Sequence, residues 1–238
     1  MPDSCELSIT LPAYREAETL RHLLPRIRAA AGRLTADYEI VVVDALRPVD
    51  DTQKVCADCG VRHLFRTNGD SFGDAIRTAI RESRGRFVMI MDADGSHNPD
   101  DFERLWCRRH EGDIIIGSRY TAGGRTKVHA GLTLQSQILN VTCRWALGLQ
   151  IRDMSNNFRL YRGEQLRALS LMSTNFEILQ EILARLAWGP AQARILEVPI
   201  TFEKRNAGES KRNLSAFIIS YLRSIRNLRR FRAAARAQ

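Results

Sequence analysis

The chain has 238 residues, of which 44% are hydrophobic and 26% charged, a composition typical of a soluble globular protein with one full core. Its formal net charge of +9 indicates an anionic partner, either nucleic acid, an anionic membrane surface or phosphorylated substrates. Five cysteines indicate a reducing compartment. Neither a secretory leader nor an apolar run of about 18 residues is visible, so we expect a chain that is not secreted and does not cross a membrane.

Short apolar runs alternate with amphipathic stretches through the first half of the chain. Strands are predicted at Leu7–Leu11, Tyr38–Val43, Arg62–Phe65, Phe87–Met91 and Ile114–Ile116. Helices are predicted around Leu20–Ile27, at Phe72–Arg81 and at Phe102–Arg109. This alternation is typical of βαβ units around a mainly parallel sheet, so we expect an α/β fold with helices flanking the sheet.

The second half of the chain has a different pattern. A polar loop at 123–127 precedes a helix that carries Leu132 and Trp145, and a further helix is predicted near Phe176–Trp188. The last predicted strand is Ile195–Phe202. We find no repeat and no low-complexity linker, so one domain is expected over residues 1–212.

Three polar segments directly follow predicted strands, namely Pro12–Tyr14, Asp44 and Asp92–Ser96. Ligands of parallel sheets bind beyond the carboxyl ends of the strands, which makes these segments candidates for a site. Asp92 and Asp94 are two residues apart and point to one side, so their oxygens suit Mg²⁺ or Mn²⁺. Such a cation makes a diphosphate a better leaving group. A solvated acidic turn is the alternative.

Six motifs follow one another along the chain. They are Pro12-Ala-Tyr14-Arg-Glu16, Val43-Asp44, Asp92-Ala-Asp94-Gly-Ser96-His97-Asn-Pro99, Gly117-Ser118-Arg119-Tyr120, Asp153-Met-Ser-Asn-Asn-Phe158-Arg159 and Arg205-Asn-Ala-Gly208-Glu209-Ser210-Lys211. In this order they resemble the motifs of family-2 inverting glycosyltransferases, and within them those of the dolichyl- or polyprenyl-phosphate mannose synthases. The resemblance runs from about Leu7 to Lys211.

The resemblance implies a GT-A fold, a Rossmann-like domain that binds a nucleotide-diphosphate sugar. It places Mg²⁺ or Mn²⁺ at Asp92, Asp94 and Ser96. It also assigns Arg205 and Lys211, with Asp94, to the reaction, where the two cations meet the donor diphosphate or the acceptor phosphate. The implied donor-binding residues are Pro12, Tyr14, Glu16, Asp44, Asp92 and Arg119, the last of which faces phosphate.

The function implied is transfer of a hexose from a GDP-mannose-like or UDP-hexose donor to a polyprenyl phosphate, with inversion. A phosphate oxygen is already anionic, so this reaction needs positioning and charge stabilisation but no strong base. A soluble hydroxyl acceptor, the second hypothesis, needs a base, for which Asp153 is the candidate; a capping or structural ion-pair role is its alternative. A non-catalytic basic binding module is the third hypothesis.

Three positions depart from the family pattern. Ala45 stands where a second acid usually contacts the nucleotide base, so the choice between guanine and uracil is not readable. Leu132 replaces an arginine that close relatives tend to carry four residues before the position of Ser136. Asn156-Asn157 stands where Ser-Gly is usual, which suggests a changed acceptor side.

Residues 213–238 form a basic amphipathic helix by pattern. It either lies among the headgroups of an anionic bilayer, at the cytoplasmic face of the membrane, or packs its apolar stripe on the domain. The stripe is Leu214, Phe217, Ile218, Tyr221, Leu222, Ile225 and Leu228, and the basic residues are Arg223, Arg226, Arg229, Arg230, Arg232 and Arg236.

Other candidate sites are weaker. Cys56 and Cys59 form one CxxC without a second pair, so we do not expect zinc. His97 follows the acidic motif and contacts either donor phosphate or only its own turn. No P-loop fingerprint occurs, and we expect no nucleic-acid partner.

Overall fold

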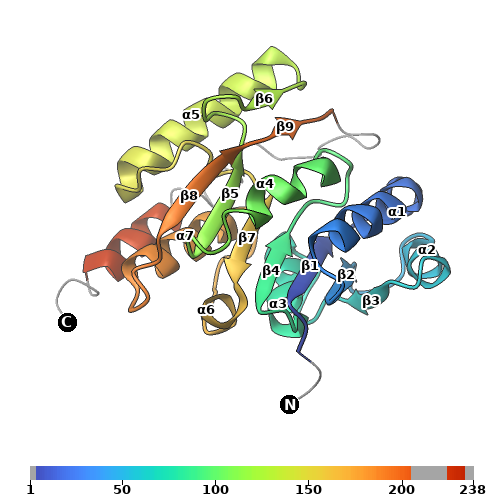
Figure 1. Ribbon diagram of the computed structural model, residues 1–238. Helices are drawn as coiled ribbons and strands as arrows, with labels where there is room; N and C mark the ends of the chain where they lie inside the picture. Colours follow the sequence, from blue (N-terminus) through green and yellow to red (C-terminus); the bar gives the residue numbers. More distant parts are fainter. Residues whose placement is uncertain (1–3, 205–223, 234–238) are drawn as a thin grey trace.

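A computed structural model describes residues 4–204 and 224–233 (Figure 1). Arg205, Lys211 and the predicted domain boundary at residues 212 and 213 lie outside the described residues. So does most of the predicted C-terminal helix, of which the structure describes residues 224–233 as helical.

A seven-stranded sheet forms the centre of the protein, in the order β3-β2-β1-β4-β7-β5-β8. Only β7 runs antiparallel to its neighbours, β4 and β5, so the mainly parallel sheet is confirmed. The strands are β1 (Leu7–Pro12), β2 (Tyr38–Asp44), β3 (Arg62–Phe65), β4 (Phe87–Ile90), β5 (Ile114–Ser118), β7 (Arg159–Arg162) and β8 (Ile195–Pro199).

Helices cover both faces of this sheet (Figure 1). The two faces follow from the alternation of strand side chains, as β4 illustrates: Phe87 and Met89 join one core cluster, and Val88 and Ile90 join the other. The helices are α1 (Ala17–Leu34), α2 (Thr52–Asp58), α3 (Phe72–Glu82), α4 (Phe102–Trp106), α5 (Ala130–Leu147), α6 (Gly163–Arg167) and α7 (Ile178–Trp188), with a short 3₁₀ turn at Pro99–Asp101.

Helices α1, α2 and α4 contribute to the first cluster, and α3, α5, α6 and α7 contribute to the second. In α1 the predicted apolar face is buried, with Leu20 and Ile27 both fully inaccessible. Helix α3 begins with a capping box, in which the Ser71 hydroxyl accepts from the Asp74 N–H and the Asp74 carboxylate accepts from the Ser71 N–H. The patterns at Leu20–Ile27 and Phe72–Arg81 therefore located α1 and α3, because the apolar faces of these helices meet the sheet, whereas the short α2 and α6 were not predicted.

The predicted strand Ile195–Phe202 is split in two. Its first part is β8, which pairs with β5, whereas β9 (Thr201–Phe202) pairs with β6 (Arg125–Thr126) in a separate two-stranded sheet. Just beyond β9, the Glu203 N–H donates to the Ser96 carbonyl at 2.8 Å. This change of sheet brings the chain from the core to the acidic motif.

The helix at 224–233 packs on the domain through part of its apolar stripe. Leu228 is 4% exposed and joins the second core cluster, and Ile225 packs against that cluster. Arg229 Nε donates to the Ala146 carbonyl at 2.9 Å, and Arg232 Nη1 donates to the Leu147 carbonyl at 3.0 Å. These arginines satisfy carbonyls at the end of α5, where Gly148 adopts the left-handed conformation (φ 66°).

Candidate active site

The three polar segments predicted from the sequence leave the sheet at one edge. Strands β1 and β2 are parallel, with Pro12 opposite Val43, and β1 and β4 are parallel, with Thr10 opposite Ile90. The carboxyl ends of these strands are therefore adjacent, and Ala13, Asp44 and Asp92 follow them. This edge is where parallel α/β sheets bind their ligands.

The acidic motif forms a tight turn after β4. Gly95 has φ 80°, a left-handed conformation that lets the chain reverse directly after Asp94. Asp94 is 4% exposed, and its Oδ1 accepts from the Ser96 N–H at 3.0 Å and from the Ser96 hydroxyl. Ser96 is fully buried, so in this arrangement its hydroxyl holds the Asp94 carboxylate.

The Asp92 carboxylate is more accessible, with 29% of its side chain exposed. Its Oδ1 accepts from Asn157 Nδ2 at 2.9 Å. The Asp92 N–H donates to His97 Nδ1 at 3.0 Å, and His97 Nε2 lies 2.7 Å from Asn156 Oδ1. His97 is fully buried and stacks on Phe158, so it supports the turn from inside.

The oxygen ligands present fit a hard divalent cation. Asp92 and Asp94, two residues apart in one turn, supply carboxylates, the ligand type that Mg²⁺ and Mn²⁺ prefer. In the part of the chain that the structure describes, no group of three or more His, Cys, Asp or Glu side chains has a metal-binding arrangement. The two carboxylates would therefore share a cation with oxygens of a bound diphosphate and with water, as Mg²⁺ often does in proteins.

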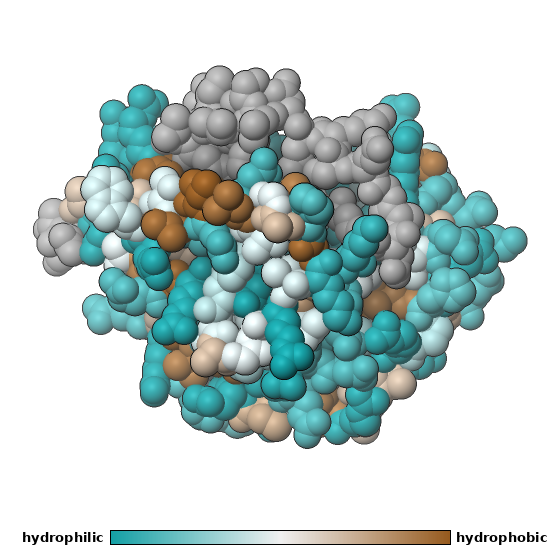
Figure 2. Space-filling view, turned by 90° about the horizontal axis from the view of Figure 1, so that it is seen from above, coloured by the Kyte–Doolittle hydropathy of each residue, from teal (hydrophilic) through white to brown (hydrophobic). Residues whose placement is uncertain are grey.

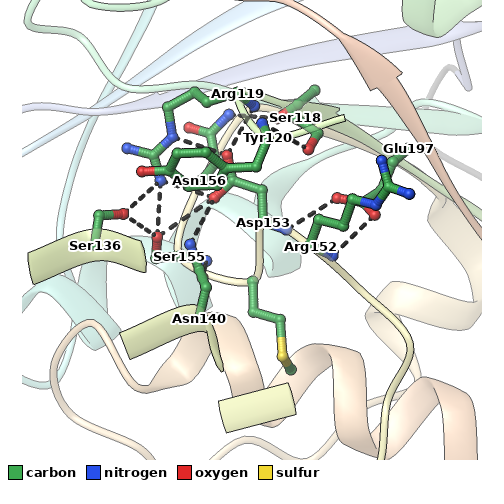
Figure 3. Close-up of polar contacts among 12 residues, drawn as sticks. Ser118, Arg119, Tyr120, Ser136, Asn140, Arg152, Asp153, Ser155, Asn156 and Glu197 are labelled. Carbon is green, nitrogen blue, oxygen red and sulfur yellow. Dashed lines mark hydrogen bonds and ion pairs between the residues drawn. The ribbon is translucent and has the colours of Figure 1, made fainter. Parts of the chain in front are cut away.

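Arg119 and Asp153 form the principal charge pair beside this edge (Figure 3). Arg119 Nε donates to Asp153 Oδ2 at 2.8 Å, and Arg119 Nη2 donates to Asp153 Oδ1 at 2.7 Å. The side chain of Asp153 is fully buried and that of Arg119 is 11% exposed. Burial alone would lower the pKa of Arg119, but the hydrogen bonds and negative charge of Asp153 outweigh it and raise that pKa above its ordinary value.

The surroundings of Asp153 fix its position further. Its N–H and that of Arg152 donate to the two carboxylate oxygens of Glu197, each at 2.9 Å. Ser136, from α5, and Ser155 accept from Arg119 Nη2 at 3.0 and 2.8 Å (Figure 3). Asp153 thus forms an ion pair, which the sequence left open as the alternative to a general base, and its role in the reaction remains a prediction.

This pairing also bears on the prediction that Arg119 faces a phosphate. Its guanidinium is directed mainly at Asp153, and its ring neighbours are Tyr120 and Phe202, with its central carbon 5.0 and 4.9 Å from their centroids. A contact between Arg119 and phosphate remains a prediction.

The expected donor segment lies at the end of β1. Tyr14 is 46% exposed, and the guanidinium of Arg66 lies 5.6 Å from its ring centroid. Arg66 is 6% exposed and donates to the carbonyls of Ala13, at 2.6 Å, and Asp70, at 2.7 Å. Burial lowers the pKa of Arg66, partly offset by neighbouring acidic groups. The exposed ring of Tyr14, held beside the guanidinium of Arg66, is suited to contact the base of a nucleotide.

The other predicted donor residues differ in accessibility. Asp44 is 1% exposed; its Oδ1 accepts from the Ala45 N–H at 2.7 Å, and its Oδ2 lies 3.3 Å from His63 Nε2. Asp44 is therefore almost closed to solvent, and its contact with the donor remains a prediction. Pro12 is buried, whereas Glu16 is half-buried at the start of α1.

For three residues of this region the sequence analysis gave either no role or a different one. Arg66 was missed, although it directly follows a predicted strand. Asn157 was expected on the acceptor side but contacts Asp92. Arg159 is fully buried, and it donates to the carbonyls of Met154, Asn156 and Leu179, which braces the 154–156 loop against α7. No local pattern marks such long-range contacts.

The two CxxC cysteines lie on α2 and at its end. Cys56 is buried on α2, and burial raises the pKa of its thiol to about 12. The expectation of ordinary thiols agrees with this environment.

Comparisons with known proteins agree with the geometry. Residues 8–170 match the family described as Glycosyl transferase family 2. The undecaprenyl-phosphate mannosyltransferase of Micrococcus luteus is 34% identical over 95% of this chain and 93% of its own length. The dolichol-phosphate mannosyltransferase of Pyrococcus furiosus is 31% identical over 94% of this chain, which covers 63% of that relative.

Among solved structures, glucosyl-3-phosphoglycerate synthase from Mycobacterium tuberculosis, in complex with Mn²⁺, UDP and phosphoglyceric acid, has a TM-score of 0.72. It is 16% identical, and the match covers 94% of this chain and 78% of that chain. This likeness confirms the predicted GT-A fold.

Proposed function

The chain belongs to glycosyl transferase family 2, and from that premise we propose that it transfers a hexose from a nucleotide-diphosphate sugar to a polyprenyl phosphate, with inversion. A mannosyl donor is the first candidate, because two relatives that align with nearly the whole chain are named as mannosyltransferases of lipid phosphates.

The environment of Asp153 is the observation that carries this proposal. An acceptor hydroxyl would need a base, and Asp153 is the residue that sequence offered for it. Its side chain is fully buried, and both of its oxygens accept hydrogen bonds from Arg119. A phosphate acceptor avoids the requirement, since its oxygen is already anionic near neutral pH and attacks the anomeric carbon directly.

The protein then contributes positioning and charge. Asp92 and Asp94 would hold Mg²⁺ or Mn²⁺, which supplies charge stabilisation to the departing diphosphate when bound. Tyr14 and Arg66 would orient the nucleotide at the end of β1. Arg205 and Lys211 follow Lys204 in the chain, beyond the contact of Glu203 with the acidic motif, and we propose that they meet donor or acceptor phosphate.

A polyprenyl acceptor resides in a membrane, and α5 offers a surface for one. Four of its large apolar side chains lie on one helical face, because their spacing is four, three and four residues. Each is more than half exposed: Leu134 58%, Ile138 58%, Val141 54% and Trp145 80%. Figure 2 views the molecule from the side on which α5 lies and shows apolar residues gathered there.

Positive charge adjoins this apolar face. The guanidinium of Arg229 lies 5.6 Å from the ring centroid of Trp145, and Arg226 and Arg230 on the same helix are exposed. An apolar face beside arginines suits an anionic bilayer surface. Among the described residues, none of the helices has the length and apolar character needed to cross a bilayer. We therefore propose peripheral association through α5 and the helix at 224–233.

The test is transfer from labelled GDP- and UDP-hexoses to a short polyprenyl phosphate, in the presence of Mn²⁺. Label that enters the organic phase with one donor, and is lost on chelation, would support the proposal and identify the base and sugar. The anomeric configuration of the product, read by NMR, checks inversion. Label that stays aqueous with every donor, although nucleotide binding is measured, would contradict the lipid-phosphate acceptor.

A further inference from the structure

Two consecutive asparagines contact the acidic motif, Asn157 at the Asp92 carboxylate and Asn156 at the His97 ring. We propose that Asn156 and Asn157 are positioning residues that together fix Asp92 for metal binding. The inference rests on the metal-dependent donor site of the proposed function. It assigns to the Asn-Asn pair a role on the donor side, at a position where the sequence pattern suggested an acceptor role.

Asn157 holds the side chain of Asp92. Asn157 is 2% exposed, and its Nδ2 donates to Asp92 Oδ1 at 2.9 Å. A carboxylate oxygen only accepts, so the amide must turn its NH₂ group toward Asp92. The hydrogen bond fixes one oxygen of Asp92 and thereby orients the other, on a side chain that is 29% exposed. Such outer partners of metal-binding carboxylates orient them for the ion.

Asn156 holds the backbone of the same residue through His97. The Asp92 N–H donates to His97 Nδ1 at 3.0 Å, so the proton of a neutral ring lies on Nε2 and points at Asn156 Oδ1, 2.7 Å away. Asn156 Nδ2 in turn donates to the Gly117 carbonyl at the end of β5. His97 and Asn156 are 0% and 3% exposed, so water does not compete for these bonds.

The side-chain carbonyl of Asn157 is a second observation that supports this role. Its Oδ1 is buried and has no hydrogen-bond partner among the described residues. An unpaired buried acceptor costs stability, and a residue without this side chain would avoid that cost. If Asn157 served only the fold, its removal should lower the stability of the protein, because its hydrogen bond to Asp92 is lost, and should not affect the metal. A positioning role predicts instead that metal affinity falls while stability is retained.

The experiment measures the dissociation constant of Mn²⁺, by calorimetry and by EPR of the bound ion, with GDP or UDP present and no sugar. The full chain is compared with Asn157→Ala, Asp92→Ala and the exposed control Asn227→Ala. We expect Asn157→Ala to weaken Mn²⁺ binding about 10- to 100-fold without lowering the melting temperature. The EPR spectrum of the remaining bound Mn²⁺ should also change, and Asn227→Ala should bind as the wild type does.

The outcomes separate the two proposals. Wild-type affinity in Asn157→Ala, with binding lost in Asp92→Ala, overturns the role of Asn157 and leaves the metal site standing. Absence of nucleotide-dependent Mn²⁺ binding in the wild type overturns the metal site and this inference together. Asn156→Ser, which shortens the side chain and so removes its contact with His97, tests the other half. An unchanged Mn²⁺ affinity in a folded Asn156→Ser protein would remove Asn156 from the assignment.

Discussion

The side chains of Arg119 and Asp153 are joined by two hydrogen bonds, Nε to Oδ2 at 2.8 Å and Nη2 to Oδ1 at 2.7 Å, in a position almost closed to solvent. The fork of a guanidinium matches the two oxygens of a carboxylate, so this geometry is both strong and specific. The pair links the end of β5 to the 153–158 loop, which also carries the asparagines that contact Asp92 and His97. The same ion pair that stabilises the domain therefore also holds in place the loop whose asparagines contact the acidic motif.

Asp153→Asn should destabilise the protein by about 3–5 kcal/mol, because it leaves the buried guanidinium of Arg119 without its counter-charge. Denaturant unfolding of the variant and the wild type measures the difference. The matched control is Glu111→Gln, which removes a partner from the exposed Arg108–Glu111 pair, whose side chains are 48% and 49% exposed. That change should cost less than about 1 kcal/mol. Equal, small losses in both variants would contradict a buried structural pair.

Asp94→Asn should reduce transfer by about three orders of magnitude or more, as expected when a charged ligand of a catalytic metal is lost. The amide has the same shape and still accepts from Ser96, so the fold should survive, as circular dichroism and the unfolding midpoint would show. Asp58→Asn, at an exposed acid on α2, is the control and should retain wild-type turnover. Normal turnover in folded Asp94→Asn would remove the metal assignment.

Leu132→Arg should strengthen the use of a phosphate acceptor. Leu132 is 57% exposed and lies one turn before Ser136, which accepts from Arg119, so an arginine there would face the same region without displacing core packing. We expect the KM for a short, water-soluble polyprenyl phosphate to fall about three- to tenfold, with kcat little changed, as one added charged hydrogen bond would give. Gln137→Arg, on the other side of α5, adds the same charge and should leave this KM unchanged. Identical effects of both variants would point to net charge alone.

Ile138→Glu should weaken binding to phosphatidylglycerol vesicles about tenfold or more, since one large apolar side chain would no longer be buried in the interface. Vesicle co-sedimentation measures the effect. Gln137→Glu adds the same negative charge at the neighbouring exposed position without removing apolar surface, and it should weaken binding far less. Nucleotide affinity should be unchanged in both. If the two variants sediment alike, charge and not the apolar face of α5 governs the association.

Replacing Arg226 and Arg230 together by glutamine should also weaken vesicle binding, by about 1 kcal/mol for each cation near the surface, and the loss should disappear at high salt. Both side chains are exposed, so the domain should keep its stability. Deletion of residues 213–238 is a poorer test, because it removes Leu228 from the core. Salt-independent binding would contradict an electrostatic contribution from this helix.

Local pattern was sufficient for most of the sheet. Five predicted strands, at Leu7, Tyr38, Arg62, Phe87 and Ile114, agree within a residue or two with β1 to β5. Strands buried on both faces are mainly apolar, which made all but the half-buried edge strand β3 easy to find. Strand β7 was not predicted, since Arg-Leu-Tyr-Arg has no apolar run and pairs between β4 and β5 only in the assembled sheet. The split of Ile195–Phe202 was missed for the same reason, since β8 and β9 differ in their partners and not in their composition.

The sequence by itself determined the α/β class, the carboxyl-edge position of the acidic motif and the resemblance to family-2 transferases, because periodicity and residue order are properties of the chain. Only the tertiary structure decided what the charged and polar side chains contact. It paired Arg119 with Asp153, 34 residues away, and Asn157 with Asp92, 65 residues away. A side chain's chemistry can be read from its letter, but a buried charge or amide takes its partner from whichever segment the packed core brings within hydrogen-bond distance.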